Sequence, residues 1–287
     1  MPMAVNDRRP PPNLGWRISA LRRPVGNLHR AISFYTDGLG FEVETRVSAD
    51  RAVLRLGNER IELVERSATC SPVPPPVPGP DVRFQHAAIV VTDMAAAFDR
   101  LASVAPRAIT RGGPQRLPVA AGGVEAFKFV DPDGHPLELI WFPPGTGDAR
   151  WRQGNCPGPT VGIDHFALSV SDLRRSLAFY ESMLGFTVVA RQTNQGTQQG
   201  RLDGLDSEVV VEVVALASGV PGTPHIELLH YRHPSPRTHE HAEVFGAIDC
   251  LLLERLANRS GRGQEPQPLP ARDPDGHALV CTLILPS

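Results

Sequence analysis

Two stretches of this 287-residue sequence share one frame: AISFYTDGLGFEVETR (31–46) and SLAFYESMLGFTVVAR (176–191). Both contain FYxxxLGF, at residues 34–41 and 179–186. In each copy, apolar residues at helical spacing end at a glycine, which predicts a helix stop followed by an alternating strand. Because the copies lie in opposite halves of the chain, they indicate an internally repeated architecture.

Further repeated segments extend this pattern. DPDGHPLELIWF (131–142) and DPDGHALVCTLI (273–284) each join strong turn chemistry to a β-rich segment, which predicts a hairpin leading into a final strand. RIELVE (60–65) matches HIELLH (225–230) in the same way. Residues 86–102 and 241–257 each predict a strand followed by a helix. The chain therefore divides into four modules in the order A, B, A′, B′, each with a strand, a helix and then further strands.

Proline-rich stretches mark the boundaries between modules. SPVPPPVPGPD (71–81) has the composition of a stiff linker, and a Pro/Gly-rich stretch (142–160) divides the chain near its middle. We therefore expect a flexible N-terminus (1–15), a first domain (16–143), a linker (144–159) and a second domain (160–287). Modules A, B, A′ and B′ are then residues 16–66, 82–143, 160–233 and 238–287.

The composition is that of a globular chain, with 41% hydrophobic and 21% charged residues. A formal net charge of -2 gives no electrostatic reason to expect nucleic acid or an anionic membrane as partner. The first residues contain no apolar signal region, and the four cysteines form no CxxC pair. We expect a cytoplasmic monomer or homodimer that acts on a small-molecule substrate.

The repeated segments resemble those of a known family. GIDHFALSVSDLRRSLAFYESMLGF followed by HIELLHY, and HAAIVVTDM followed later by DPDGHPLELIWFP, resemble paired modules of the glyoxalase/bleomycin-resistance/dioxygenase (vicinal oxygen chelate) superfamily. The resemblance covers the chain from about residue 16. It implies an α+β fold in which four βαβββ modules pair into two cup-shaped mixed β-sheets with helices on the outside.

The resemblance also implies two metal-ligand positions in each module, one on the first strand and a Glu on the last strand. Carried over by alignment, the first-strand positions are Ala20 in A, His86 in B, His165 in A′ and His241 in B′. The last-strand positions are Glu62 in A, Glu138 in B, Glu227 in A′ and Val280 in B′. Two of these positions therefore lack a ligand residue.

Strand alternation supports these assignments independently. In HFALSV (165–170), His165 shares a face with Ala167 and Ser169, while the apolar residues share the opposite face. Glu138 shares its face with apolar neighbours, and a buried carboxylate there is costly without a charged partner or a metal. His135 and His277, in the two DPDGH turns, are interpreted as structural.

Two module pairings remain open. Pairing of neighbours would give each cup three ligands: Glu62, His86 and Glu138 in one, and His165, Glu227 and His241 in the other. Crossed pairing would place B against A′ and collect His86, Glu138, His165 and Glu227 in one cup. We favour crossed pairing, because both lost positions then fall in the other cup.

Two histidines and two glutamates suit a divalent Zn, Ni, Co, Mn or Fe(II) ion. The expected chemistry is that of a lyase or isomerase: Lewis-acid activation of a chelating oxygenated substrate, with Glu138 or Glu227 as general base. One alternative is a ring-cleaving dioxygenase that uses the 2-His-1-carboxylate set His165, Glu227 and His241. Another is a binding protein without turnover. The polar segment 191–208 is either a lid or an exposed loop.

Overall fold

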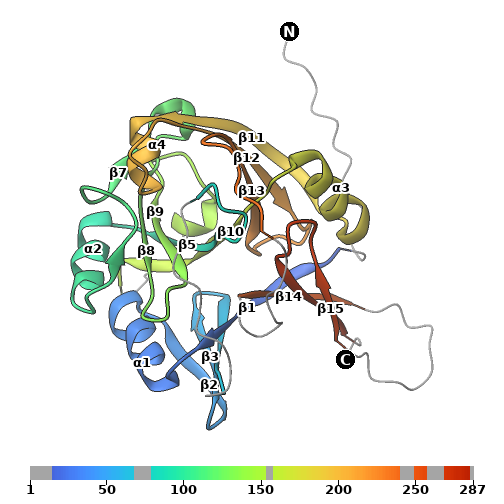
Figure 1. Ribbon diagram of the computed structural model, residues 1–287. Coiled ribbons are helices and arrows are strands. Elements are labelled where there is room, and N and C mark those ends of the chain that lie inside the picture. Colours follow the sequence, from blue (N-terminus) through green and yellow to red (C-terminus); the bar gives the residue numbers. More distant parts are fainter. Residues whose placement is uncertain (1–14, 68–78, 153–157, 240–248, 257–267, 285–287) are drawn as a thin grey trace.

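The computed structural model describes residues 15–67, 79–152, 158–239, 249–256 and 268–284. It is an α+β structure with two mixed β-sheets and few helices (Figure 1), which confirms the predicted fold class. Residues 1–14 and His241 lie outside the described residues. None of the helices in the described ranges has the length and apolar character needed to cross a membrane.

The larger sheet has nine strands and combines modules B and A′. Its order is β11-β12-β13-β10-β5-β9-β8-β6, with β7 paired to β8. Module B supplies β5 (Gln85–Val91), β6 (Arg107–Ala108), β7 (Gln115–Arg116), β8 (Glu125–Val130) and β9 (Pro136–Trp141). Module A′ supplies β10 (Thr160–Ser169), β11 (Thr187–Gly196), β12 (Val209–Ala217) and β13 (His225–His233).

The smaller sheet has seven strands and combines modules A and B′, in the order β15-β16-β14-β1-β4-β3-β2. Module A supplies β1 (Arg17–Val25), β2 (Glu42–Ser48), β3 (Arg51–Leu56) and β4 (Glu59–Glu65). Module B′ supplies β14 (Cys250–Leu256), β15 (Leu269–Arg272) and β16 (Ala278–Ile284).

The modules thus pair crosswise, in the arrangement that the distribution of ligand residues favoured. β5 lies antiparallel to β10 in one sheet, and β1 lies antiparallel to β14 in the other. In Figure 1 the blue and red strands accordingly share one sheet, whereas the green, yellow and orange strands share the other. Each sheet takes one module from each half of the sequence, so the two halves are interleaved in space.

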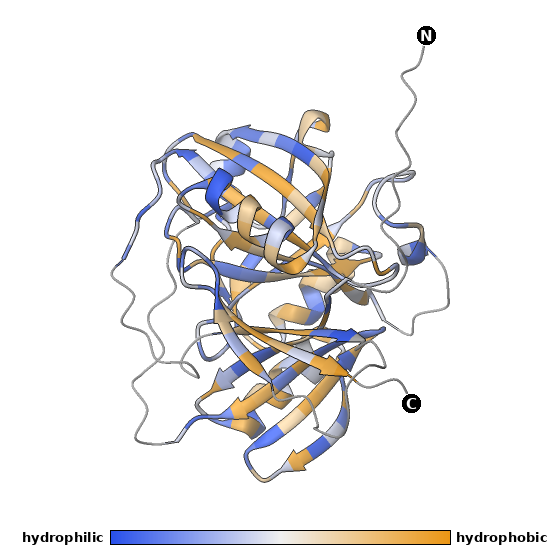
Figure 2. Cartoon of the chain, turned by 90° about the vertical axis from the view of Figure 1, so that its right-hand side faces the viewer, coloured by the Kyte–Doolittle hydropathy of each residue, from blue (hydrophilic) through white to orange (hydrophobic). Residues whose placement is uncertain are grey.

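Hydropathy alternates along many strands (Figure 2), as expected where one sheet face packs on the core and the other does not. β3 is an example: Ala52, Leu54 and Leu56 are buried, and the residues between them are partly exposed. The central strands β5 and β10 are buried along their whole length. Polar side chains on these two strands therefore have to be satisfied inside the protein.

The helices are few, and several of them begin or end at a capping residue or a glycine. They are α1 (Leu28–Ser33), which continues into the π-helical turn η1 (Phe34–Gly38), α2 (Met94–Ala102), α3 (Leu173–Leu184) and α4 (Thr197–Leu202), with short 3-10 turns η2 (Val119–Ala121) and η3 (Ala149–Arg152). The Asp172 side chain caps α3 by accepting from Arg175 N, and Asp93 caps α2 in the same way. Gly185 ends α3 in the left-handed region at φ 70°, which confirms the predicted glycine stop.

The two repeated sequence motifs contact each other. Tyr35 of the first FYxxxLGF frame donates a hydrogen bond from its hydroxyl to Asp131 of the first DPDGH turn, at 2.9 Å. Tyr180 of the second frame donates to Asp273 of the second turn, at 3.1 Å. Since modules A and B belong to different sheets, as do A′ and B′, these contacts join the sheets on both sides of the pseudo-symmetric molecule.

The predicted structural role of the turn histidines agrees with their contacts. His135 Nε2 lies 2.6 Å from Pro24 O and its Nδ1 lies 2.9 Å from Asp249 Oδ1. His277 Nε2 lies 2.9 Å from Ser169 O. Each histidine therefore fastens its turn to a strand end of the preceding module.

Two segments differ from simple expectation. Residues 250–256 form strand β14 between β1 and β16, so the helix predicted towards the end of 241–257 is wrong over these residues. The polar segment 191–208, predicted to be a lid or an exposed loop, contains the end of β11 and the short helix α4. Leu202 of α4 is buried against Leu117 and Ala121 of module B, so the segment is docked onto the partner module.

Candidate metal centre

The central strands place both predicted histidines on one face of the nine-stranded sheet. In the antiparallel register of β5 and β10, His86 pairs with Ala167 and His165 pairs with Ala88. Residues opposite each other across a ladder share a face, so the two imidazoles project to the same side. Their ring centroids lie 5.8 Å apart.

The flanking strands add the two predicted glutamates to the same face. Glu138 on β9 pairs with Ala88 in parallel register, and Glu227 on β13 pairs with Ala167. The two alanines therefore each lie between a histidine and a glutamate, where their small side chains leave room for the larger ones. The four residues form what we call the His–Glu set: His86, Glu138, His165 and Glu227.

Distances within the His–Glu set are those of potential metal ligands. His86 Nε2 lies 2.7 Å from Glu138 Oε2, and His165 Nε2 lies 3.4 Å from Glu227 Oε2. Ligand atoms of His86, Glu138 and His165 all lie within 4.8 Å of one another. Donor atoms this close, two nitrogens and one carboxylate, fit the coordination shell of a divalent transition metal, and Glu227 lies beside His165 at the edge of this group.

His86 provides a direct test of whether a cation fits. Its side chain is only 2% exposed, yet Nδ1 makes no hydrogen bond to any described residue, and Nε2 faces the carboxylate of Glu138 at 2.7 Å. Burial lowers the pKa of His86, which favours the neutral ring that a metal requires. A buried imidazole with an unpaired nitrogen is costly, and a cation bound by His86 and Glu138 would give the ring a further partner.

The carboxylates of the set stay ionised. Burial alone would raise the pKa of Glu138, but the charge of Lys128 and the contact with His86 outweigh it and bring the pKa to about 2. Burial would also raise the pKa of Glu227, but the neighbouring His165 and His225 outweigh this effect and lower the pKa. For His165, burial opposes protonation, but Glu227 and Asp164 raise the pKa to about 9. The site thus holds two carboxylates that attract a cation.

A cavity of about 470 Å³ lies against the His–Glu set. Its walls include the apolar side chains of Val124, Ile140, Phe142, Val211 and Leu229. Helix α4 contributes Gln199 and Leu202 to the lining, so the segment docked on module B encloses part of the cavity. The other walls are charged or polar, and a pocket that combines apolar walls with converging polar groups is the usual form of a small-molecule site.

Sequence reasoning missed several charged residues of this cavity. Buried Lys128 lies across the ladder from Glu138, and its Nζ lies 2.7 Å from Asp203 Oδ1. Tyr231 also donates to Asp203, at 3.0 Å. Asp164 lies beside His165. Lys128 was detectable as a charge flanked by Phe127 and Phe129 in a strand, but the position of Asp203 depends on the docking of α4, which no local pattern shows.

The seven-stranded sheet carries no equivalent set in its described strands. In this sheet Ala20 on β1 pairs with Leu252 on β14, and Leu252 pairs with Val280 on β16. The corresponding pairs in the larger sheet are His165 with Ala88, and Ala88 with Glu138. By the same registers, Cys250 occupies the place of His86, and His241, the predicted first-strand ligand of B′, lies outside the described residues. The four equivalent positions are Ala20, Glu62, Cys250 and Val280.

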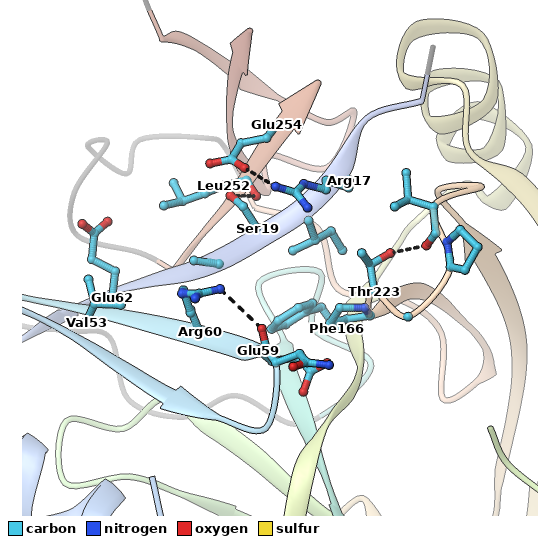
Figure 3. A pocket seen from close by; sticks show the side chains of 17 residues that line it. Arg17, Ser19, Val53, Glu59, Arg60, Glu62, Phe166, Thr223, Leu252 and Glu254 are labelled. Carbon is cyan, nitrogen blue, oxygen red and sulfur yellow. Dashed lines mark hydrogen bonds and ion pairs between the residues drawn. The ribbon is translucent and has the colours of Figure 1, made fainter. Parts of the chain in front are cut away.

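Glu62 is held by arginines instead. Arg22 Nε lies 2.5 Å from one carboxylate oxygen, and Arg51 forms an ion pair with the other. A second cavity, of about 430 Å³, is lined by Glu62, Ala20 and Leu252. Figure 3 shows Glu62 in this cavity, apart from the Arg17–Glu254 ion pair. These two cavities are therefore chemically different.

The family profile of the Glyoxalase/Bleomycin resistance protein/Dioxygenase superfamily matches residues 17–139 and 162–280. Catechol-2,3-dioxygenase of Bacillus subtilis (strain 168) is 25% identical over 196 residues, which are 60% of this chain and 66% of that protein, just under two thirds of its length.

Solved structures are similar over most of the chain. Glyoxalase I from Zea mays has a TM-score of 0.60 at 20% identity, covering 93% of this chain and 92% of that one. A putative dioxygenase from Bacillus subtilis subsp. subtilis str. 168 has a TM-score of 0.52 at 14% identity, covering 94% and 86%. The family profile spans most of both halves, and the fold agrees with it. The chain belongs to the glyoxalase/bleomycin resistance protein/dioxygenase superfamily.

Proposed function

We propose that the chain is a metal-dependent enzyme that catalyses proton transfer on a small oxygenated substrate, in a reaction of the lyase or isomerase type. The observation that carries this proposal is the His–Glu set: crossed pairing brings two histidines and two glutamates to one face beside one cavity. Zn, Ni, Co, Mn and Fe(II) all suit this donor set.

His86, Glu138, His165 and Glu227 would hold the ion. When bound there, a divalent cation supplies Lewis acidity towards a chelating carbonyl or hydroxyl group. The apolar wall formed by residues such as Ile140 and Phe142 would exclude water from the bound substrate.

Glu227 is the better general base of the two glutamates. The side chain of Glu227 is 21% exposed, whereas that of Glu138 is 7% exposed. Glu138 is also held more tightly, 2.7 Å from His86 and beside Lys128. A base has to reach the substrate proton and then release it, so the carboxylate at the cavity surface suits the role, with Oε1 or Oε2 as the atom that takes the proton.

Metal content per chain tests the proposal, with protein purified without a metal-affinity tag. We expect close to one equivalent in the wild type, loss of the metal in His86→Ala, and retention in the matched control Glu62→Gln. Retention in His86→Ala would contradict the proposed site. Absence of metal from the wild type, even after reconstitution, would favour a binding protein without turnover.

Proton transfer is tested separately on the metal-loaded protein. We expect exchange of solvent deuterium into members of a panel of small α-hydroxycarbonyl compounds, followed by NMR, and loss of the exchange in Glu227→Gln. Metal-loaded wild-type protein that exchanges no member of the panel would count against this reaction type.

A ring-cleaving dioxygenase is the second candidate. His86, His165 and Glu138 form a 2-His-1-carboxylate group, and the 25% identical relative is a catechol-2,3-dioxygenase. The predicted alternative was His165, Glu227 and His241; His241 lies outside the described residues, and in the described strands A′ pairs with B. Oxygen uptake by anaerobically Fe(II)-loaded protein with a catechol panel would support this candidate, and its absence would exclude the catechols tested.

A further inference from the structure

One hydrogen bond distinguishes the two histidines of the His–Glu set. His165 Nδ1 lies 3.0 Å from Asp164 Oδ2, in hydrogen-bonding geometry. The corresponding nitrogen of His86 makes no hydrogen bond to any residue in the described ranges. The two imidazoles therefore differ in whether a neighbouring residue fixes the Nδ1 atom.

Asp164 is itself fixed by a second contact. Trp151 Nε1 donates to Asp164 Oδ1 at 3.0 Å, so one carboxylate oxygen serves the indole and the other serves the imidazole. Asp164 is 8% exposed. A buried carboxylate with both oxygens engaged has a defined orientation.

Trp151, which lies in η3, is held in turn by contacts with its neighbour Arg150 and with strand β10. The guanidinium of Arg150 stacks 3.7 Å from the centre of the Trp151 ring, and Arg150 also binds Glu59 of the smaller sheet at 2.5 Å. A Cβ at Gly162 would lie 2.6 Å from the Trp151 ring, so β10 approaches the indole more closely than any other residue type would allow. The indole thus has little freedom to move away from Asp164.

We propose that Asp164, fixed by Trp151, is a positioning residue that holds the proton of His165 on Nδ1 and leaves the Nε2 lone pair free for the metal. This inference rests on the proposed function. Binding of a metal would release the Nε2 proton of His165 to solvent, and a carboxylate that accepts from Nδ1 keeps the other proton in place. His165 Nε2 then faces Glu227, 3.4 Å away, on the side of the His–Glu set. Partners of this kind orient ligating histidines and raise their basicity.

The decisive variant is Asp164→Asn, which keeps the shape of the side chain. If the amide oxygen still accepts from Trp151, its NH2 group faces His165 Nδ1, which must then accept and leaves the proton on Nε2. We expect the dissociation constant for Zn²⁺ to rise roughly 10- to 100-fold. We expect a smaller rise in Trp151→Phe, which removes the indole donor but keeps the packing.

The control variant is His225→Gln. His225 Nδ1 lies 3.8 Å from Asp164 Oδ2, and Asp164, His165 and His225 could together hold an ion themselves. If they do, His225→Gln loses the metal, His86→Ala keeps it, and the positioning role is overturned. The expected result is that His225→Gln still binds one equivalent of Zn²⁺, whereas His86→Ala does not.

The visible spectrum of the Co(II)-loaded protein separates positioning from ligation. A positioning residue changes affinity but not the donor atoms, so saturated Asp164→Asn should keep the wild-type band positions. Shifted bands would make Asp164 a ligand, and wild-type affinity in a folded Asp164→Asn would show that it does not position His165.

If Asp164→Asn fails to fold, wild-type Zn²⁺ affinity in Trp151→Phe overturns the inference. Wild-type affinity in both His86→Ala and His165→Ala would instead refute the proposed function.

Discussion

The two glutamates of the His–Glu set differ in how firmly their neighbours hold them. Glu138 lies between His86 and Lys128, whereas Glu227 faces His165 and His225 at 3.4 and 3.5 Å. We predict that Glu227→Gln lowers the proton-transfer rate by roughly 10²- to 10⁴-fold and keeps more metal than Glu138→Gln. Rate and metal content measured on the same preparations check this, and the opposite order of metal loss would assign the base role to Glu138.

A second prediction at the residue scale concerns pH and His135. Burial alone would lower the pKa of His135, but the charges of Asp249 and Asp131 outweigh it and raise the pKa. Because the folded state binds this proton more tightly than the unfolded state, its contribution to stability is complete below the ordinary pKa of about 6.5. That contribution is lost as pH rises through the raised folded value.

We therefore predict that the difference in unfolding free energy between wild type and His135→Gln shrinks as pH rises from about 6 to about 9. Urea unfolding at a series of pH values measures the difference. His29→Gln, at an exposed position, is the control. A difference for His135→Gln that grows with pH would mean that the ring is neutral in the folded protein.

At the scale of elements, the contact between each FYxxxLGF helix and its DPDGH turn provides a matched pair of variants. The Tyr35 hydroxyl donates to Asp131 and also accepts from Arg23, a fully buried side chain, at 2.6 Å. The Tyr180 hydroxyl donates to Asp273. We predict that Tyr35→Phe costs more stability than Tyr180→Phe, because it leaves a buried cation with one acceptor fewer.

The expected costs are about 1–3 kcal/mol, with Tyr35→Phe at the upper end. Denaturant unfolding of both variants measures them. Equal costs would show that Asp249, which already accepts from Arg23 at 2.5 Å, satisfies the guanidinium without the tyrosine.

Much of this arrangement follows from local patterns, and the exceptions have physical causes. His165 and Glu138 could be placed because strand alternation is a local property of the backbone. β14 could not, since its leucine-rich sequence has high helix propensity and becomes a strand only through pairing with β1 and β16. The Tyr35–Asp131 contact also escaped prediction: each repeat was visible in the sequence, but their partnership depends on tertiary packing.

At the scale of the whole molecule, crossed pairing gives the two cavities different chemistry. One cavity gathers carboxylates that lack arginine partners, Glu138 and Glu227, beside two histidines. In the other, the described carboxylates Glu59, Glu62 and Glu254 each pair with arginine. Duplicated modules thus allow one site to keep cation-binding residues while the other is stabilised by ion pairs within the protein.

This asymmetry predicts a stoichiometry of one divalent ion per chain. At the second site Ala20 and Val280 offer no donor atom, and burial raises the pKa of the Cys250 thiol to about 12, so the thiolate that a metal requires is scarce. Glu62 is already bound by Arg22 and Arg51. Calorimetric titration with Zn²⁺ should therefore saturate near one equivalent, in the wild type and in Glu62→Gln alike. Saturation at two equivalents in the wild type, falling to one in Glu62→Gln, would mean that a cation displaces the arginines and that both cavities bind metal.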